Sequence, residues 1–232
     1  MPELIYHLNR SRISDGTAIF DSFDEHSWVK VGCEGCGYAF FGGRVWPAKV
    51  EFIGGGMPEF SGCTGGIKIG QAAPAREVAE KFNGIVVKEI AWLRKLRPKD
   101  RKTKKRIPDD GILEVFATDC IEPVPGRGTV FLPKPACQVC GRRFEKIGGV
   151  RLPNYFGEDQ TPADCVVWDG GRKPGEGILL TKEEARGLDM FRFGFQGPLG
   201  LGTPIVSQRL VEHFLERGWR GWVFTEIGEI VD

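Results

Sequence analysis

Two pairs of cysteines carry the clearest chemistry in this sequence, because each pair has the spacing of a metal-binding turn. Cys33 and Cys36 lie in "VGCEGCGYAF", and Cys137 and Cys140 lie in "ACQVCGRRF". In a CxxC turn both thiolates face one point, and the glycine that follows allows the positive φ angle that closes the turn. Four thiolates fill the tetrahedral shell of Zn²⁺, and thiolates favour zinc over magnesium or calcium. The sequence therefore predicts one structural zinc bound by these four cysteines.

Two other interpretations of the cysteine pairs stay open, because the pairs are about a hundred residues apart and compact zinc fingers are far shorter. The pairs could be redox-active, or they could be reduced cysteines in turns without metal. A thioredoxin-like redox pair lies at the start of a helix, whereas the residues after Cys36, "GYAFFGG", are typical of a strand. If zinc is bound, its shell is full, so we expect no catalytic zinc.

The other three cysteines, Cys63, Cys120 and Cys165, have no partner at this spacing. Free cysteines are among the residues most often buried, which is the expectation for all three. Cys63, in a glycine-rich loop, and His26, just before the first pair, are the candidates for a substitute zinc ligand.

General-base chemistry has few candidates, since the chain has only three histidines, His7, His26 and His213. None lies in a recognisable nucleophile or metal motif, and His213 falls in an expected helix, where a solvated or hydrogen-bonded histidine is usual. The sequence contains no phosphate-binding loop, dinucleotide fingerprint, HExxH or GxSxG motif. We therefore expect a protein that is not an enzyme.

The composition is that of a globular chain with many turns. The 232 residues are 41% hydrophobic and 27% charged, and they include 33 glycines and 15 prolines. No apolar run approaches the roughly 18 residues that span a bilayer, and the first residues lack the basic start and apolar run of a secretory signal. We expect a cytoplasmic protein with no membrane partner, in which the seven cysteines stay reduced.

The basic residues are concentrated in one segment. Between Arg94 and Arg106, "RKLRPKDRKTKKR" holds nine basic residues and one acid, so that 23 basic and 30 acidic residues remain elsewhere, a formal charge of −7. The segment could contact phosphate or an acidic protein, or it could be a solvated, mobile loop at 94–106. It has no aromatic residue after Trp92 on which bases could stack.

The first part of the chain is expected to be rich in strands. "HSWVKV" (26–31) and "RVWPAKVEFI" (44–53) have strand composition, with Gly42-Gly43 breaking the run between them. A helix is expected from Pro74, stopping near Asn83 and able to restart after it. "ILEVFA" (112–117) is expected to be a strand.

The last quarter has the clearest local signals. Thr181 and Glu184 match a capping box. Ser207 is expected to cap a helix that ends at Gly218 and presents one apolar face, formed by Leu210, Val211, Phe214 and Leu215. "GWVFTEI" (221–227) is expected to close the chain as a strand.

Together these features predict one mixed, strand-rich α+β domain over residues 1–232. It would contain zinc-knuckle elements at 31–41 and 135–145 and a C-terminal helix–strand unit. No internal repeat is recognisable apart from the two cysteine pairs.

The order of these features resembles the myxobacterial double-CxxCG motif family, regarded as immunity proteins that protect a cell from a toxin made by its kin. The resemblance rests on the early "IYHL", on "CEGCG" and "CQVCG", and on the terminal "SQRLVEHFLERGWRGWVF". The basic 94–106 segment and the "GGGMPEFSGCTGG" loop depart from the family. We expect partner specificity in those segments, since immunity proteins diverge at toxin-facing surfaces.

The resemblance implies binding of a cognate toxin protein in the cytoplasm, with charge complementarity that speeds association. The −7 body would suit a basic toxin such as a nuclease. The alternative is a zinc-ribbon-like protein that binds nucleic acid through 94–106. A redox protein built on the two cysteine pairs is a third possibility.

Overall fold

The computed structural model describes only part of the chain, and all structural statements below concern that part. The described residues are 2–10, 19–21, 28–32, 34–35, 39–44, 47–53, 57–62, 67–92, 111–121, 124, 126–131, 137–139, 146–150, 166–193 and 204–232.

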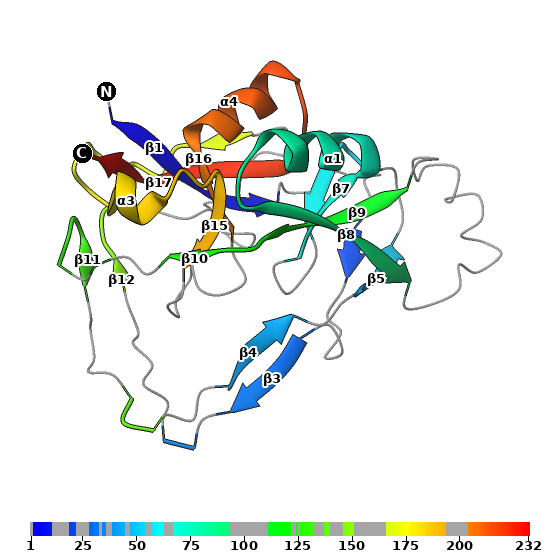
Figure 1. Cartoon of the computed structure of the whole chain (residues 1–232), viewed down its shortest axis with the longest axis horizontal. Coiled ribbons are helices and arrows are strands. Elements are labelled where there is room, and N and C mark those ends of the chain that lie inside the picture. The colour runs from blue at the N-terminus through cyan, green and yellow to red at the C-terminus, as the bar shows by residue number, and fades with distance from the viewer. Residues whose placement is uncertain are drawn as a thin grey trace.

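The described residues form three helices and many short strands, a mixed α+β fold (Figure 1). The helices are α1 (Ala72–Lys81), α3 (Lys182–Ala185) and α4 (Gln208–Glu216). The strands are β1 (Glu3–Arg10), β2 (Ile19–Asp21), β3 (Trp28–Gly32), β4 (Ala39–Arg44), β5 (Ala48–Ile53), β6 (Phe60–Gly62), β7 (Lys68–Gln71), β8 (Ile85–Trp92), β9 (Ile112–Ala117), β10 (Cys120–Ile121), β11 (Val130–Phe131), β12 (Lys146–Ile147), β13 (Val167–Trp168), β14 (Ile178–Thr181), β15 (Met190–Phe193), β16 (Pro204–Ser207) and β17 (Trp222–Val231).

Most strands belong to two larger sheets. One has the order β10-β15-β16-β1-β17-β13, with β14 also paired to β17, and the other has the order β2-β5-β8-β9-β7-β6. Two further pairs, β3-β4 and β11-β12, are separate two-stranded ribbons among the described residues. The N-terminal strand β1 thus lies inside a sheet built otherwise from the second half of the chain.

The two larger sheets repeat one arrangement that the sequence does not reveal. In one, β7 leads through α1 to β8, and β9 lies between these strands, antiparallel to both. In the other, β16 leads through α4 to β17, and β1 lies between them, antiparallel to both. An antiparallel strand precedes each unit, β6 beside β7 and β15 beside β16. The fold therefore uses the same strand–strand–helix–strand unit twice.

The loop after α1 in the first unit bonds to the first strand of the second unit. The backbone N–H groups of Asp189 and Met190 donate to the Asn83 carbonyl at 2.9 and 3.2 Å. In return, the Asn83 N–H donates to Asp189 Oδ2 at 2.9 Å. Gly84 follows with φ of 81°, and a β-carbon there would collide with the Met190 carbonyl oxygen.

The loop after α4 makes the matching contacts with the first unit. The Phe60 N–H donates to the Arg220 carbonyl at 3.1 Å, and the Arg220 N–H donates to Glu59 Oε2 at 3.2 Å. Gly221 follows with φ of 102°, and a β-carbon there would collide with the Phe60 carbonyl oxygen. The junction is therefore reciprocal: in each unit, the loop after the helix bonds to the start of the first strand of the other unit.

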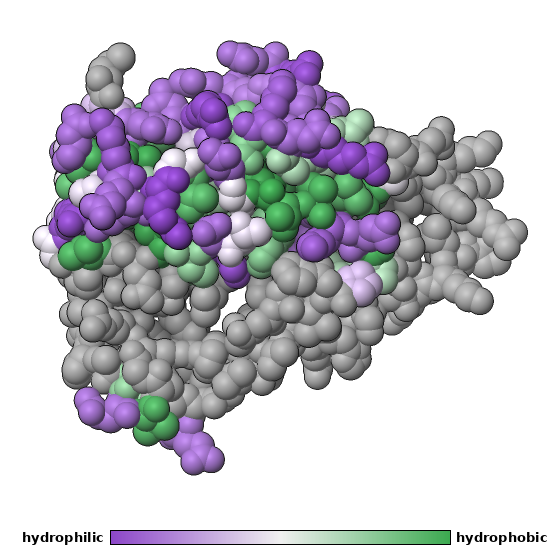
Figure 2. Space-filling model, viewed as in Figure 1, coloured by the Kyte–Doolittle hydropathy of each residue, from purple (hydrophilic) through white to green (hydrophobic). Residues whose placement is uncertain are grey.

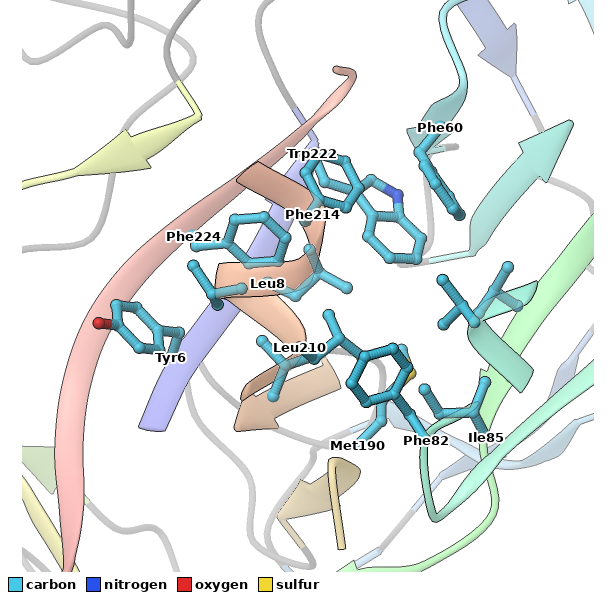
Figure 3. Packing of buried hydrophobic residues seen from close by; sticks show 14 of the residues in the cluster. Tyr6, Leu8, Phe60, Phe82, Ile85, Met190, Leu210, Phe214, Trp222 and Phe224 are labelled. Atoms are coloured by element: carbon cyan, nitrogen blue, oxygen red, sulfur yellow. The ribbon is translucent and has the colours of Figure 1, made fainter. Parts of the chain in front are cut away.

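The main hydrophobic core lies between the helices and the two sheets (Figure 3). Phe214 of α4 packs edge-on against Phe224 and stacks on Trp222, with ring centroids 5.0 and 5.7 Å apart. Phe60 of the other unit lies 4.3 Å from the Trp222 ring. The cluster also takes Tyr6, Leu8, Ala75, Val78, Phe82, Ile85, Val115, Ala117, Met190, Val206, Leu210 and Val211. Both units therefore share one core.

Helices α1 and α4 lie side by side over this core and are joined through Glu77. The Glu77 carboxylate accepts hydrogen bonds from His213 and Lys81, each at 3.0 Å, and from Arg217. Although partial burial raises the pKa of Glu77, the bonds from Arg217, Lys81 and His213 outweigh it and lower that pKa to about 2. The outward face of the helices is hydrophilic (Figure 2).

A second core covers the opposite face of the sheet that contains β1. Side chains alternate along a strand, so Tyr6 and Leu8 face the helices while Ile5 faces the other way. Ile5 joins a buried cluster with Ile121, Val130, Ile178, Leu180, Ala185, Phe191, Phe193, Ile205, Ile227 and Ile230. The sheet is therefore buried on both faces.

The helix predicted from Pro74 exists as α1, but it begins earlier, at Ala72. Tertiary contacts satisfy its first turn in place of a side-chain cap, since the Ala72 N–H donates to the Gly111 carbonyl at 3.0 Å. Over the described residues 85–92 a helix does not restart after Asn83, which corrects the second part of the prediction there. Residues 85–92 form β8, because the β-branched run pairs with β9.

The strands expected at 26–31 and 44–53 correspond to β3 and β5, but Gly42-Gly43 does not break the run between them. These glycines lie within β4, where the register against β3 shifts between Val29 and Lys30. A glycine suits such an irregularity because it adapts to the altered backbone. The strand at 112–117 is confirmed as β9.

The local signals of the last quarter are largely confirmed. Thr181 and Glu184 form the capping box of α3. The Ser207 side chain accepts from the Leu210 N–H at the start of α4, and Gly218 takes φ of 65° after it. Leu215 was expected on the buried face and is 49% exposed, because the face that packs on the core is narrower than predicted.

Candidate functional site

The first CxxCG element lies at the tip of the β3-β4 ribbon. The two strands pair antiparallel up to Gly32 and Ala39, which brackets the cysteine turn between them. Glu34 and Gly35, the residues between the two cysteines, form an exposed turn. The end of the hairpin therefore carries Glu34 and Gly35, and the cysteines on either side of them in the sequence, Cys33 and Cys36, lie outside the described residues.

The second CxxCG element lies in the connection between β11 and β12. Val130 of β11 is buried in the second core. Thr129 fixes the base of the ribbon, since its N–H donates to the Gly177 carbonyl at 3.0 Å and its hydroxyl donates to the Gly148 carbonyl at 2.7 Å. Cys137 is partly buried at the far end of this connection, and Cys140 lies outside the described residues.

The two cysteine turns touch each other. A β-carbon placed on Gly35 would lie 3.3 Å from Cys137 Sγ and 2.8 Å from Val139 Cβ. A side chain at position 35 would therefore collide with the second turn. The short described segments at the bottom of Figure 1 are these two turns. Elements far apart in the sequence are thus brought within contact distance at the place where both pairs of thiols are expected.

This contact fits a metal ion held between the turns, because the backbone of one turn lies against the sulfur of the other. Cys137 is the only one of the four predicted ligands among the described residues. Within those residues no group of three or more histidine, cysteine or acidic side chains is placed to hold a metal. The four-cysteine zinc site therefore stays a prediction.

Of the remaining cysteines and the candidate substitute ligands, Cys63, Cys165 and His26 lie outside the described residues. Cys120 was expected to be buried and is exposed in the short edge strand β10. Its carbonyl accepts a hydrogen bond from Arg186 at 3.1 Å. The next residue, Ile121, projects to the opposite face and is buried in the second core, so only one face of β10 is covered.

His213 behaves as expected for a hydrogen-bonded helical histidine. Its Nε2 lies 3.0 Å from Glu77 Oε1, and its ring packs on Phe82 and Trp219 at centroid distances of 5.2 and 5.4 Å. These contacts give it a structural role in joining α1 to α4.

His7 is a buried polar residue that the sequence does not single out. It lies at the middle of β1 and is 3% exposed. Burial in the first place, and the Lys68 ammonium in the second, lower the pKa of His7 to about 3. His7 lies on the same face of β1 as Ile5, because side chains alternate along a strand. The alternation is visible in the sequence. Whether that face is buried depends on the elements that cover it, which the sequence does not show.

The basic 94–106 segment lies outside the described residues, so its predicted mobility and contacts stay predictions. Among the described helices none has the length and apolar character needed to cross a membrane.

Comparison with known proteins adds no assignment: no family model, no curated protein and no solved structure matches this chain.

Proposed function

We propose that this protein is an immunity protein, which binds and neutralises a cognate antibacterial toxin in the cytoplasm of the producing cell. In this proposal Cys33, Cys36, Cys137 and Cys140 hold one structural zinc. The zinc cross-links the two CxxCG ribbons, and its four thiolate ligands leave no position for a reactive water. The protein acts by binding, and no reaction is assigned to it.

The observation that carries this proposal is the contact of Gly35 with Cys137 and Val139. The resemblance to the double-CxxCG family rests in part on the two short CxxCG motifs, which would not indicate a shared site if they lay apart in the fold. Their contact supports treating them as one element.

The charge distribution supports a protein partner. Without the 94–106 segment, the chain carries a formal charge of −7, which complements a basic toxin such as a nuclease. Opposite charge speeds encounter between partners and disfavours wrong ones.

Co-expression tests the function directly. The toxin is expected to be encoded by a neighbouring gene, and cells that express it should grow when this protein is co-expressed. Growth should be lost when Cys33→Ser and Cys137→Ser remove one ligand from each turn, since the ribbons then separate. An exposed substitution in the same turn, Glu34→Ala, is the matched control and should keep protection. Absence of protection by the wild-type protein would remove the proposed function.

The nucleic-acid alternative predicts a different result. Retention on heparin or DNA that falls with salt, and that disappears when the basic residues of 94–106 are neutralised, would favour it over toxin binding.

A further inference from the structure

Unpartnered polar atoms gather at one place in the second core. Four buried side-chain polar atoms of the described residues have no hydrogen-bond partner. Three of them are His7 Nδ1, Thr225 Oγ1 and Trp168 Nε1; the fourth is Arg192 Nε. Buried polar atoms are nearly always paired, so unpaired ones indicate an unassigned water, ion or ligand.

His7, Thr225 and Trp168 occupy one row across three adjacent strands. His7 of β1 is directly opposite Thr225 of β17, and Thr225 is directly opposite Trp168 of β13. Residues opposite each other on neighbouring strands project from the same face, about 5 Å apart. The row formed by His7, Thr225 and Trp168 is named the polar row below.

Apolar side chains enclose His7 and Thr225 of the polar row, whereas Trp168 is partly exposed. Ile205 lies opposite His7 on the other neighbouring strand and closes that end. Ile5 precedes His7 on its face, and Val223 and Ile227 lie on either side of Thr225; all are 0% exposed. His7 and Thr225 are themselves 3% and 0% exposed, so bulk water does not hydrate them.

The chemistry of the row favours a ligand that accepts hydrogen bonds. The Trp168 indole N–H can only donate, while the Thr225 hydroxyl and neutral His7 can each donate one hydrogen bond. Burial in the first place, and the Lys68 ammonium in the second, lower the pKa of His7, so the charge of Lys68 acts on this residue of the row. A hydrogen bond to an anionic oxygen is about twice as strong as one to a neutral oxygen, and this gain offsets the cost of taking the anion out of water.

We propose that the polar row binds a small oxyanion, whose oxygens accept hydrogen bonds from His7, Thr225 and Trp168. The oxyanion is a phosphate or a carboxylate, which share this chemistry. The site is separate from the cysteine turns and does not depend on the immunity function.

The test uses the full-length protein, with sodium phosphate and sodium acetate as probes and sodium chloride at matched ionic strength as the reference. The imidazole signals of His7 are followed by NMR as each probe is added. A saturable change with either probe is expected, together with a rise in the pKa of His7, because a bound anion favours the protonated ring. A response to phosphate alone would identify the ligand as a phosphate, and a response to acetate alone would identify it as a carboxylate. Either response supports the site.

Two variants separate the polar row from a general salt effect. Thr225→Val keeps the side-chain shape and removes the hydroxyl, so affinity for the probe should fall about tenfold, the value of one hydrogen bond to a charged group. Ile230→Val trims an apolar side chain of the same strand that lies outside the row, opposite Glu3, and should leave affinity unchanged.

Trp168→Phe is a second test of the row, independent of Thr225, and should also weaken binding. Thr225→Val is expected to fold, since it removes a buried hydroxyl that lacks a partner. The proposal is overturned if neither probe gives a saturable change, which would leave ordered water as the occupant. It is also overturned if Thr225→Val and Trp168→Phe bind the probe as tightly as the wild type.

Discussion

At the scale of single residues, His7 makes folding sensitive to acid. Its imidazole is neutral when buried, with the pKa lowered to about 3, while in the unfolded chain it titrates near its ordinary value of 6.5. Between these values the unfolded state binds the proton and the folded state does not. The stability that neutral, buried His7 contributes is therefore fully present above pH 6.5 and is lost as the pH falls toward 3.

We predict that His7→Gln removes this part of the acid sensitivity. Denaturant unfolding in phosphate-free buffer should show that the difference in unfolding free energy between wild type and variant changes by at most about 1.4 kcal/mol per pH unit below pH 6.5. The wild type should lose its advantage as the pH falls. Parallel pH profiles for the two proteins would show that His7 is not buried in its neutral form.

Gly35 is the residue at which the two cysteine turns are closest. No β-carbon fits there, because Val139 Cβ and Cys137 Sγ are 2.8 and 3.3 Å from its position. Glycine is therefore required by the close approach of the second turn.

Gly35→Ala should push the turns apart and weaken metal binding, while Glu34→Ala, in the same turn but exposed, should not. Competition with a chelator measures this, and we expect the Gly35→Ala protein to release zinc at a chelator concentration at least about tenfold lower. Equal retention of zinc by both variants would mean that the turns do not share the ion.

At the scale of elements, the predictions succeed where the residues that start and end an element are local in the sequence. Helix α4 could be predicted because its start and end are local: Ser207 caps the first turn and Gly218 adopts a positive φ angle. The capping box of α3 is local in the same way. Such signals depend on neighbours in the sequence, so they can be read without the fold.

Other elements depend on residues far away in the chain, and there the sequence is insufficient. Residues 85–92 fit a helical pattern but become β8 by pairing with β9. The repeat of the unit is invisible because its middle strand is β9 in one copy and the N-terminal β1 in the other. The CxxC spacing identifies each cysteine turn, but their contact is a tertiary property. The polar row depends likewise on long-range pairing of β1 with β17.

The C-terminal unit should be indispensable for folding. Strand β17 pairs with β1, β13 and β14, and α4 supplies Leu210 and Phe214 to the main core. We predict that a chain ending before Ser207 fails to fold cooperatively, as measured by thermal unfolding followed by circular dichroism. A soluble truncated protein with a sharp unfolding transition would contradict this prediction.

At the scale of the whole molecule, the two units form a framework, and this framework positions the two cysteine ribbons. Both units share one core, so the framework is continuous from β1 to β17. The two cysteine ribbons project from it and touch at their ends. A zinc ion at that contact would fix the relative positions of the ribbons without taking part in a reaction, leaving function to a binding surface.

The zinc content of the purified protein tests this central proposal most directly. We predict one zinc per folded chain, and we predict that Cys33→Ser and Cys137→Ser each lose the metal and lower the unfolding temperature, because a structural zinc contributes to folding stability. Loss of the metal from both variants would show that the two turns share one zinc, because Cys33 and Cys137 come from different turns. A wild-type protein that is metal-free and equally stable with and without these cysteines would contradict the shared site.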